Sequence, residues 1–216
     1  MAHVALADFT TSGPRGKSLR HAVRRTEAAG AVFSVEPAAA VPALIPELEG
    51  VSAAWLADKA GREKRFSLGA FDAAYLARFP IALVRVEGRI VAFANIWVSG
   101  DGEEASVDLM RHHPDAPYGT MEMMMVRLLG WAREAGYERF NLGMAPLSGM
   151  PSGRLAPVWA RLGHALFANG ERLYGFAGLR AFKAKYGPAW VSRYIATQPG
   201  AAMPRTLIDL ARLVSA

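Results

Sequence analysis

The sequence predicts a mixed α/β (α+β) fold in which helices flank a mainly antiparallel sheet. Three successive segments have the apolar and β-branched character of strands, at residues 80–86, 89–98 and 105–111. Glu87-Gly88 separates the first two and is a two-residue hairpin signal, so an antiparallel meander is the simplest arrangement. A helical pattern follows over 117–136, and then a strand pattern over 138–143. A meander that leads into a helix crossover indicates the α+β class.

The segment 117–136 has the clearest helical pattern in the chain. Its apolar residues follow the i, i+3, i+4, i+7 spacing of one helical face: Met121, Met124, Met125, Leu128, Leu129 and Ala132. Gly136 is the expected end of this helix. We interpret the methionine row as core packing, with a lipid-contacting surface as the alternative.

The N-terminal segment divides into two parts. Residues 1–14 show no clean period and end on Gly13-Pro14, so we interpret them as a leader or the trailing edge of a missing upstream region. We expect one domain over 15–216. It begins with a basic helix that carries five positive charges within eleven residues: Arg15, Lys17, Arg20, Arg24 and Arg25. Gly30 ends this helix, and a strand is expected at 31–36.

The other elements are predicted from shorter signals. Pro37, Pro42 and Pro46 are expected to break the stretch after the strand at 31–36. The remaining expected elements are a short helix at 72–78, helices at 155–168 and 178–186, a strand at 190–197 and a closing amphipathic helix at 203–214. We interpret the closing helix as core or domain packing, with membrane contact as the alternative.

Composition restricts the functional classes. The chain has 216 residues, of which 52% are hydrophobic and 20% charged, so it can bury a core and is not intrinsically disordered. It has no cysteine, which excludes disulfides, thiolate chemistry and cysteine-bound metal. No apolar run is long enough to span a bilayer. A net charge of +6 and a pI near 9.9 favour a polyanionic partner, either nucleic acid or an anionic membrane surface.

Two polar residues at the end of a predicted strand are candidates for chemistry. Asp108 and Arg111 lie three positions apart among apolar neighbours. They could form a structural ion pair, or they could act as a carboxylate that deprotonates a hydroxyl beside a guanidinium that holds a phosphate. The adjacent His112 and His113 offer no spacing for a closed metal site, so we expect them in a loop and expect no metal.

Gly119-Thr120 begins the long helix. The order of meander, helix and strand is that of the GNAT acyltransferase fold, in which this position carries a glycine-rich loop that cradles the coenzyme A pyrophosphate. Here the segment 115–120 lacks the second glycine, which disfavours an ordinary coenzyme A enzyme.

The segment 169–188 interleaves basic and aromatic residues. Its charged residues are Glu171, Arg172, Arg180, Lys183 and Lys185, and its aromatic residues are Tyr174, Phe176, Phe182 and Tyr186. A solvated basic face explains the charges, and a site for a single-stranded nucleic acid end explains both sets.

Several blocks together resemble the C-terminal catalytic region of the bacterial multiple peptide resistance factor family, the phosphatidylglycerol lysyltransferases and alanyltransferases. The resemblance covers about Lys17 to Tyr194. Its blocks are Phe66-Ser-Leu-Gly69, Phe93-Ala-Asn95, Ser106-Val-Asp-Leu-Met-Arg111, Gly119-Thr-Met121, Phe140-Asn-Leu-Gly-Met-Ala-Pro-Leu147, Asn169-Gly-Glu-Arg172, Gly178-Leu-Arg-Ala-Phe-Lys183, Trp190 and Arg193-Tyr194.

The resemblance implies a GNAT-like fold and transfer of an aminoacyl group from aminoacyl-tRNA to the glycerol hydroxyl of phosphatidylglycerol, without a cofactor. The implied catalytic residues are Asp108, Arg111, Glu171 and Lys183. Further substrate-binding positions are Arg180, Asn95, Asn141, Gly119 and Thr120. Lys17, Arg20, Arg24 and Arg25 are expected to contact tRNA or anionic lipid.

The resemblance also implies a place of action and leaves alternatives. We expect a cytoplasmic domain peripheral to the inner face of the cell membrane, or part of a longer membrane protein. The alternatives are a tRNA-dependent aminoacyltransferase with another acceptor, a GNAT-type coenzyme A N-acyltransferase, and a non-catalytic module that binds tRNA or anionic membrane.

Overall fold

The computed structural model describes residues 1–59, 69–146, 148, 176–194, 196, 205, 206 and 209. Its strands are β1 (Ala2–Ala5), β2 (Ala31–Glu36), β3 (Ile81–Val86), β4 (Arg89–Val98), β5 (Glu104–His112), β6 (Arg139–Asn141) and β7 (Ala189–Trp190). Its helices are α1 (Lys17–Ala28), the 3-10 turn η1 (Ala38–Ala40), α2 (Val41–Asp58), α3 (Ala73–Leu76), α4 (Thr120–Glu134) and α7 (Phe176–Ala184).

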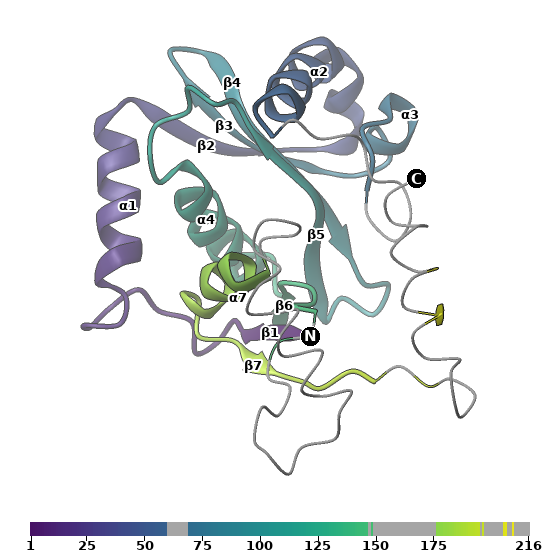
Figure 1. The fold of residues 1–216 in the computed structure, drawn as a ribbon. Helices are drawn as coiled ribbons and strands as arrows, with labels where there is room; N and C mark the ends of the chain where they lie inside the picture. Colours follow the sequence, from purple (N-terminus) through teal and green to yellow (C-terminus); the bar gives the residue numbers. More distant parts are fainter. Residues whose placement is uncertain are drawn as a thin grey trace.

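The described strands form one sheet in the order β2-β3-β4-β5-β6-β1-β7 (Figure 1). All neighbouring strands are antiparallel except β5 and β6, which are parallel and are joined through α4. A parallel pair needs a crossover of this kind, because a tight turn reverses the chain direction. The predicted meander, helix crossover and mainly antiparallel sheet are confirmed, and their order is that of a GNAT-like fold.

Helices cover both faces of the sheet, as Figure 1 shows. On one face, α1 and α4 pack on a core that includes Leu19, Met124 and Val84. On the other face, α2 and α3 pack on a second core that includes Leu48 and Leu83. Because successive residues of a strand point to opposite faces, β3 supplies both cores and is apolar throughout its first four residues.

The hairpin between β3 and β4 forms at the predicted Glu87-Gly88 turn. The φ angles of these two residues are 50° and 80°. Two consecutive positive φ angles are typical of a type I′ turn, whose twist matches that of the flanking strands. Gly30 ends α1 as predicted, with a φ of 81°.

The interpretation of residues 1–14 as a leader or trailing edge is wrong for Ala2–Ala5, because these residues form strand β1 of the sheet. β1 lies inside the sheet, between β6 and β7, and Ala2, Val4 and Leu6 are buried in the core shared with α4. The strand is only four residues long, so its period is too short to detect in the sequence. Its partners lie far along the chain and had no local signal.

The expected break at the prolines is also wrong. A single helix, α2, runs through Pro42 and Pro46. Pro42 lies in the first turn, where its missing N–H would have no partner in the helix anyway. Pro46 forgoes one backbone hydrogen bond, and the burial of Leu48 and Val51 beneath α2 offsets that cost. The last expected strand, 190–197, is also shorter than predicted, since β7 ends at Trp190.

None of the helices in the described part of the chain has both the length and the apolarity needed to cross a bilayer.

Candidate functional site

A β-bulge interrupts β5 in the middle of the sheet. Ala94 pairs with Met110 and Ile96 pairs with Val107, so Asp108 and Leu109 together oppose Asn95. The backbone N–H of Leu109 donates to Oδ1 of Asn95 at 2.7 Å. This side chain therefore takes the place of the ladder partner that the bulge removes. Asn95 is fully buried and supports the bulge, and its expected role at the substrate stays a prediction.

The bulge changes which face each β5 side chain occupies. Val107 and Met110 pack toward the core of α4, whereas Leu109 is in the core of α2. In a regular strand, residues three apart point to opposite faces. Here Asp108 and Arg111 both point to the face covered by α2 and α3, because the bulge inserts one residue between them.

Asp108 is held by two donors. The backbone N–H of Gly69 donates to Oδ1 at 3.0 Å, and the hydroxyl of Tyr75, in α3, donates to Oδ2 at 2.6 Å. Nε1 of Trp97 in turn donates to the Tyr75 hydroxyl at 3.1 Å. A carboxylate with a donor on each oxygen has a defined orientation, and its remaining lone pairs can still accept a proton.

Gly69 allows the close approach of this carboxylate. A Cβ atom at position 69 would lie 2.0 Å from Oδ2 of Asp108, far inside van der Waals contact. Position 69, the last residue of the Phe66-to-Gly69 block, therefore has no room for a side chain while Asp108 keeps this orientation.

The pKa of Tyr75 shows how strongly the phenol is tied to the carboxylate. Burial, the hydrogen bond to Asp108 and the negative charge of Asp108 together raise the pKa of Tyr75 to about 12, against smaller opposing effects of Trp97 and Asn95. Tyr75 therefore keeps its proton at physiological pH and donates a hydrogen bond to Asp108.

Arg111 lies deeper than expected for a residue that meets substrate. Its side chain donates to Oγ of Ser52 in α2, and its guanidinium lies 5.1 Å from the ring centre of Trp55. The residue is 3% exposed. These contacts anchor α2 to β5, and the expected contact of Arg111 with a phosphate or an oxyanion stays a prediction.

The strands β5 and β6 separate next to Asp108. Their register runs from Glu104 opposite Arg139 to Ser106 opposite Asn141. β5 continues to His112, whereas β6 ends at Asn141. Asp108 thus lies two residues beyond the last described pair on one strand, and Gly143 lies two residues beyond it on the other.

Lys183 reaches this separation from α7. Its Nζ donates to the carbonyl oxygen of Met144 at 2.6 Å, and a Cβ at Gly143 would lie 3.3 Å from Nζ. Burial lowers the pKa of Lys183 to about 8. An ammonium of this kind can hold an anion and can also give up its proton near neutral pH.

Arg180 lies one helical turn before Lys183 on α7. It donates to Oγ of Ser148 at 3.0 Å, and its guanidinium lies 4.4 Å from the ring centre of Trp190 in β7. The two predicted basic residues of α7 therefore both contact residues that follow β6 in the chain, Met144 and Ser148.

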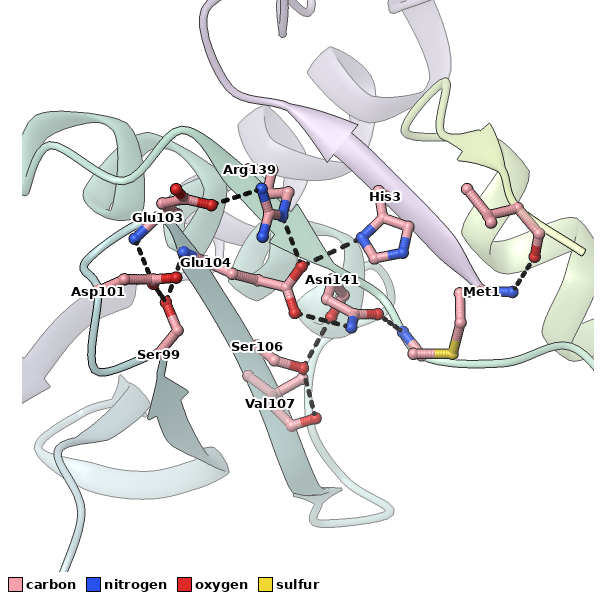
Figure 2. Close-up of polar contacts among 12 residues, drawn as sticks. Met1, His3, Ser99, Asp101, Glu103, Glu104, Ser106, Val107, Arg139 and Asn141 are labelled. Carbon is pink, nitrogen blue, oxygen red and sulfur yellow. Dashed lines mark hydrogen bonds and ion pairs between the residues drawn. The ribbon is translucent and has the colours of Figure 1, made fainter. Parts of the chain in front are cut away.

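Asn141 contacts protein groups on both sides of its amide. Nδ2 donates to Oε1 of Glu104 at 3.0 Å, and Oδ1 accepts from the backbone N–H of Gly143 at 2.8 Å (Figure 2). It was expected to bind substrate, but its amide groups contact the protein and hold the turn that follows β6.

Gly119 and Thr120 lie against α1. A Cβ at Gly119 would be 3.1 Å from Oγ1 of Thr26 and from the Cβ of Ala22, and Thr120 donates to the carbonyl of Pro117 at 2.6 Å. Gly119 also has a φ of 99°. These contacts explain both residues by helix packing and capping, and their substrate role stays a prediction.

The basic face of α1 has two kinds of residue. Lys17 and Arg24 are exposed and line a hollow together with Arg15 and His21. Arg20 also lines this hollow, but its guanidinium donates to the carbonyls of Thr11 and Gly13 and holds the preceding turn. The guanidinium of Arg25 lies 4.9 Å from the exposed ring of Tyr118. A polyanion can therefore reach Lys17 and Arg24, whereas Arg20 has an internal role.

Some predicted positions lie outside the described residues. These are Glu171, Arg172 and Tyr174, the expected helix at 155–168, and most of the expected closing helix.

Sequence reasoning missed the residues that orient Asp108. Tyr75 and Trp97 look like ordinary core aromatic residues in the sequence, since their spacing from Asp108 has no period. Gly69 was named only as part of a family block.

The strand order and the α4 crossover define a mixed α/β domain with a GNAT-like fold. The chain belongs to the family described as "Phosphatidylglycerol lysyltransferase, C-terminal", which matches residues 1–197.

Relatives in this family are much longer. The phosphatidylglycerol lysyltransferase of Bacillus subtilis (strain 168) is 40% identical over 215 residues, which are 99% of this chain and 25% of that protein. That of Staphylococcus aureus (strain COL) is 30% identical over 214 residues, again 99% of this chain and 25% of the protein. The chain therefore spans about a quarter of the length of these curated relatives.

Two solved structures are similar to this chain over nearly all of its length. The C-terminal domain of a putative lysylphosphatidylglycerol synthetase from Agrobacterium fabrum has a TM-score of 0.84 and 45% identity, and the match covers 99% of this chain and 64% of that one. L-PGS from Bacillus licheniformis has a TM-score of 0.82 and 40% identity, with 100% and 64% covered.

Proposed function

We propose that this chain carries the transfer step of phosphatidylglycerol aminoacylation. It moves a lysyl or alanyl group from aminoacyl-tRNA to the glycerol hydroxyl of phosphatidylglycerol. The names of relatives up to 40% identical support the acceptor and the reaction class. The observation that carries the proposal is the Asp108 carboxylate, which two donors orient where β5 and β6 separate.

The reaction exchanges one ester for another. The glycerol hydroxyl oxygen attacks the acyl carbonyl carbon and forms the new C–O bond, and its proton passes to a base. The bond to the tRNA ribose oxygen then breaks, and that oxygen takes up a proton. Because an ester is lost and an ester is formed, the exchange needs no ATP. The barrier lies in deprotonating the hydroxyl and in stabilising the tetrahedral oxyanion.

We assign the hydroxyl to Asp108 as base or orienting group, because its carboxylate is held by Gly69 and Tyr75. Lys183 and Arg180 hold a phosphate of the lipid or of the tRNA end, since both cations contact residues that follow β6. Glu171 binds the amino group of the transferred amino acid, and Arg111 holds a lipid phosphate or the oxyanion.

The basic hollow on α1 supplies the longer-range attraction. Lys17 and Arg24 are exposed there, and both tRNA and phosphatidylglycerol membranes are polyanions. We place the domain at the inner face of the cell membrane, where both substrates meet. Attaching an amino acid lowers the negative charge of the lipid, which favours resistance to cationic antimicrobial peptides.

The proposal is tested with labelled aminoacyl-tRNA and phosphatidylglycerol vesicles, followed by lipid extraction. Labelled lipid is expected with the wild type, and Asp108→Asn is expected to lower its rate by roughly 10²- to 10⁴-fold if the carboxylate is the base. Asp101→Asn is the matched control, because Asp101 is an exposed carboxylate in the β4–β5 loop. Full activity of a folded Asp108→Asn variant refutes the assignment. Labelled product without lipid favours another acceptor.

A further inference from the structure

A polar network joins β5, β6 and β1 where β5 and β6 are paired, before the two strands separate next to Asp108. Figure 2 shows its residues, with Glu104 at the centre. Oε2 of Glu104 accepts from Nε of Arg139 at 2.8 Å and lies 3.2 Å from Nδ1 of His3. Oε1 accepts from Nδ2 of Asn141 at 3.0 Å. One carboxylate therefore contacts three side chains from two neighbouring strands.

The network continues into the turn that receives Lys183. Asn141 accepts from the backbone N–H of Gly143 through Oδ1, and its own carbonyl accepts from Oγ of Ser106 at 2.8 Å. The next residue, Met144, supplies the carbonyl that Lys183 contacts. Three hydrogen bonds and the backbone from Gly143 to Met144 thus connect Glu104 to the ammonium of Lys183.

The two parts of the proposed site depend on this network for their relative position. Asp108 is on β5, and Lys183 is held by the turn after β6. β5 and β6 pair directly over only three described residue pairs. So short a register leaves room for the strands to shift, and the side-chain bonds of Glu104 and Asn141 reinforce it where they begin to separate.

The electrostatics of Glu104 agree with a tightly held carboxylate. Burial by itself would raise its pKa, but hydrogen bonds from Asn141 and Arg139 and the charge of His3 outweigh burial, so the pKa is lowered. Glu104 is thus an anion that three side chains of the protein hold in place.

We propose that Glu104 and Asn141 are positioning residues that hold the Gly143–Met144 segment, and thereby fix the Lys183 ammonium beside the residues that follow β6. This inference rests on the proposed function for its catalytic consequence. Its structural content, the placement of Lys183, can be measured without any transfer activity.

The test follows the pH dependence of Lys183 acetylation by acetic anhydride, with tandem mass spectrometry to separate Lys183 from Lys185. In the wild type we expect a midpoint near the lowered pKa of Lys183, about 8. In Asn141→Ala, Gly143 loses its acceptor, the turn loosens and water reaches the ammonium. The midpoint is then expected to rise by about one unit or more toward the ordinary lysine value of about 10.4.

Two variants at Glu104 are expected to shift the midpoint of Lys183 acetylation by different amounts. Glu104→Ala is expected to shift the midpoint as Asn141→Ala does, and Glu104→Gln less, because the amide oxygen can still accept from Asn141. The matched control is Glu36→Ala. Glu36 pairs with Arg85 at 3.3 Å and has a side chain 29% exposed, against 23% for Glu104, but it lies on β2 at the far edge of the sheet. Its removal is expected to leave the Lys183 midpoint unchanged.

The outcomes separate this inference from the proposed function. Circular dichroism melting first establishes that each variant is folded. If folded Asn141→Ala and Glu104→Ala keep the wild-type midpoint, the positioning role is refuted. If the midpoint shifts and kcat of lipid aminoacylation falls with KM little changed, both proposals are supported. If the midpoint shifts while transfer stays normal, the positioning role stands and the catalytic assignment of Lys183 is wrong.

Discussion

The hydroxyl of Tyr75 in α3 and the carboxylate of Asp108 in β5 lie 2.6 Å apart, although the two residues are 33 positions apart in the sequence. The hydrogen bond spans the face of the sheet that α2 and α3 cover. It orients Asp108 from one side, while the backbone of Gly69 orients it from the other.

Replacing Tyr75 with Phe removes the donor to Oδ2 and leaves the ring packing in place. A hydrogen bond to a charged group contributes about 1.5–3 kcal/mol, so transfer to phosphatidylglycerol is expected to fall roughly ten- to a hundredfold. The rate of labelled lipid formation measures this loss of transfer activity. Tyr137→Phe is the control, since Tyr137 packs on Trp131 beside α4. Equal activity of the two variants would contradict the orienting role of Tyr75.

Replacing Gly69 with Ala puts a methyl group where the Asp108 carboxylate lies, 2.0 Å from Oδ2. The carboxylate must move, and transfer is expected to fall toward the level of Asp108→Asn. Gly130→Ala is the control, because a Cβ at this position in α4 meets no atom within 4 Å. It is expected to leave transfer unchanged and to stabilise the fold by about 0.4–1 kcal/mol, measured by urea unfolding. A fully active Gly69→Ala enzyme would show that Asp108 need not be held there.

The buried Lys183 makes stability depend on pH. Its pKa is about 8 in the folded chain and 10.5 in the reference state, so the unfolded chain binds more protons between these values. The free energy of unfolding of the wild type is expected to rise from pH 8 to 10.5, relative to that of Lys183→Met. Below pH 8 the difference is expected to be constant. Urea unfolding of both proteins at pH 7, 8.5 and 10 tests this, and parallel curves across the window would refute it.

Substitution of the exposed cations Lys17 and Arg24 is expected to affect tRNA binding, whereas substitution of the hydrogen-bonded Arg20 is expected to affect stability. The double variant Lys17→Ala, Arg24→Ala should weaken binding to tRNA, and the slope of log affinity against log salt should fall by one to two if these side chains contact phosphates. Its melting temperature should stay unchanged, because both side chains are exposed. Arg20→Ala should instead lower the melting temperature, since Arg20 holds the turn at Thr11 and Gly13. Filter binding over a salt series and thermal melting measure the two effects. An unaltered salt slope in the double variant would show that Lys17 and Arg24 do not contact phosphates of the tRNA.

Local patterns were sufficient for much of the fold. The hairpin at Glu87-Gly88, the meander, the helix before Gly136 and the strand after it all follow from periodicity and turn chemistry. These features depend on neighbours within one or two turns of chain, which a sequence displays directly. Family blocks added Asp108, Arg180 and Lys183, which the structure places on either side of the separation between β5 and β6.

Other features follow from contacts between distant segments. β1 is a strand because Asn141 and Trp190 lie close enough to pair with its residues. The bulge at Asp108 is visible only against Asn95, and it alone turns Asp108 and Arg111 to one face. Side-chain type in the sequence did not reveal that Arg20, Arg111 and Asn141 already contact other protein groups.

The primary sequence was thus sufficient for the class of fold, because local period encodes it, and for the family and the candidate site residues, because the family blocks carry them. Which of these polar groups meet one another, and which are already used within the protein, was decided by tertiary packing. The physical reason is that a hydrogen bond depends on distance and direction between two atoms, and residues such as Tyr75 and Asp108 acquire both only when the sheet and its helices have assembled.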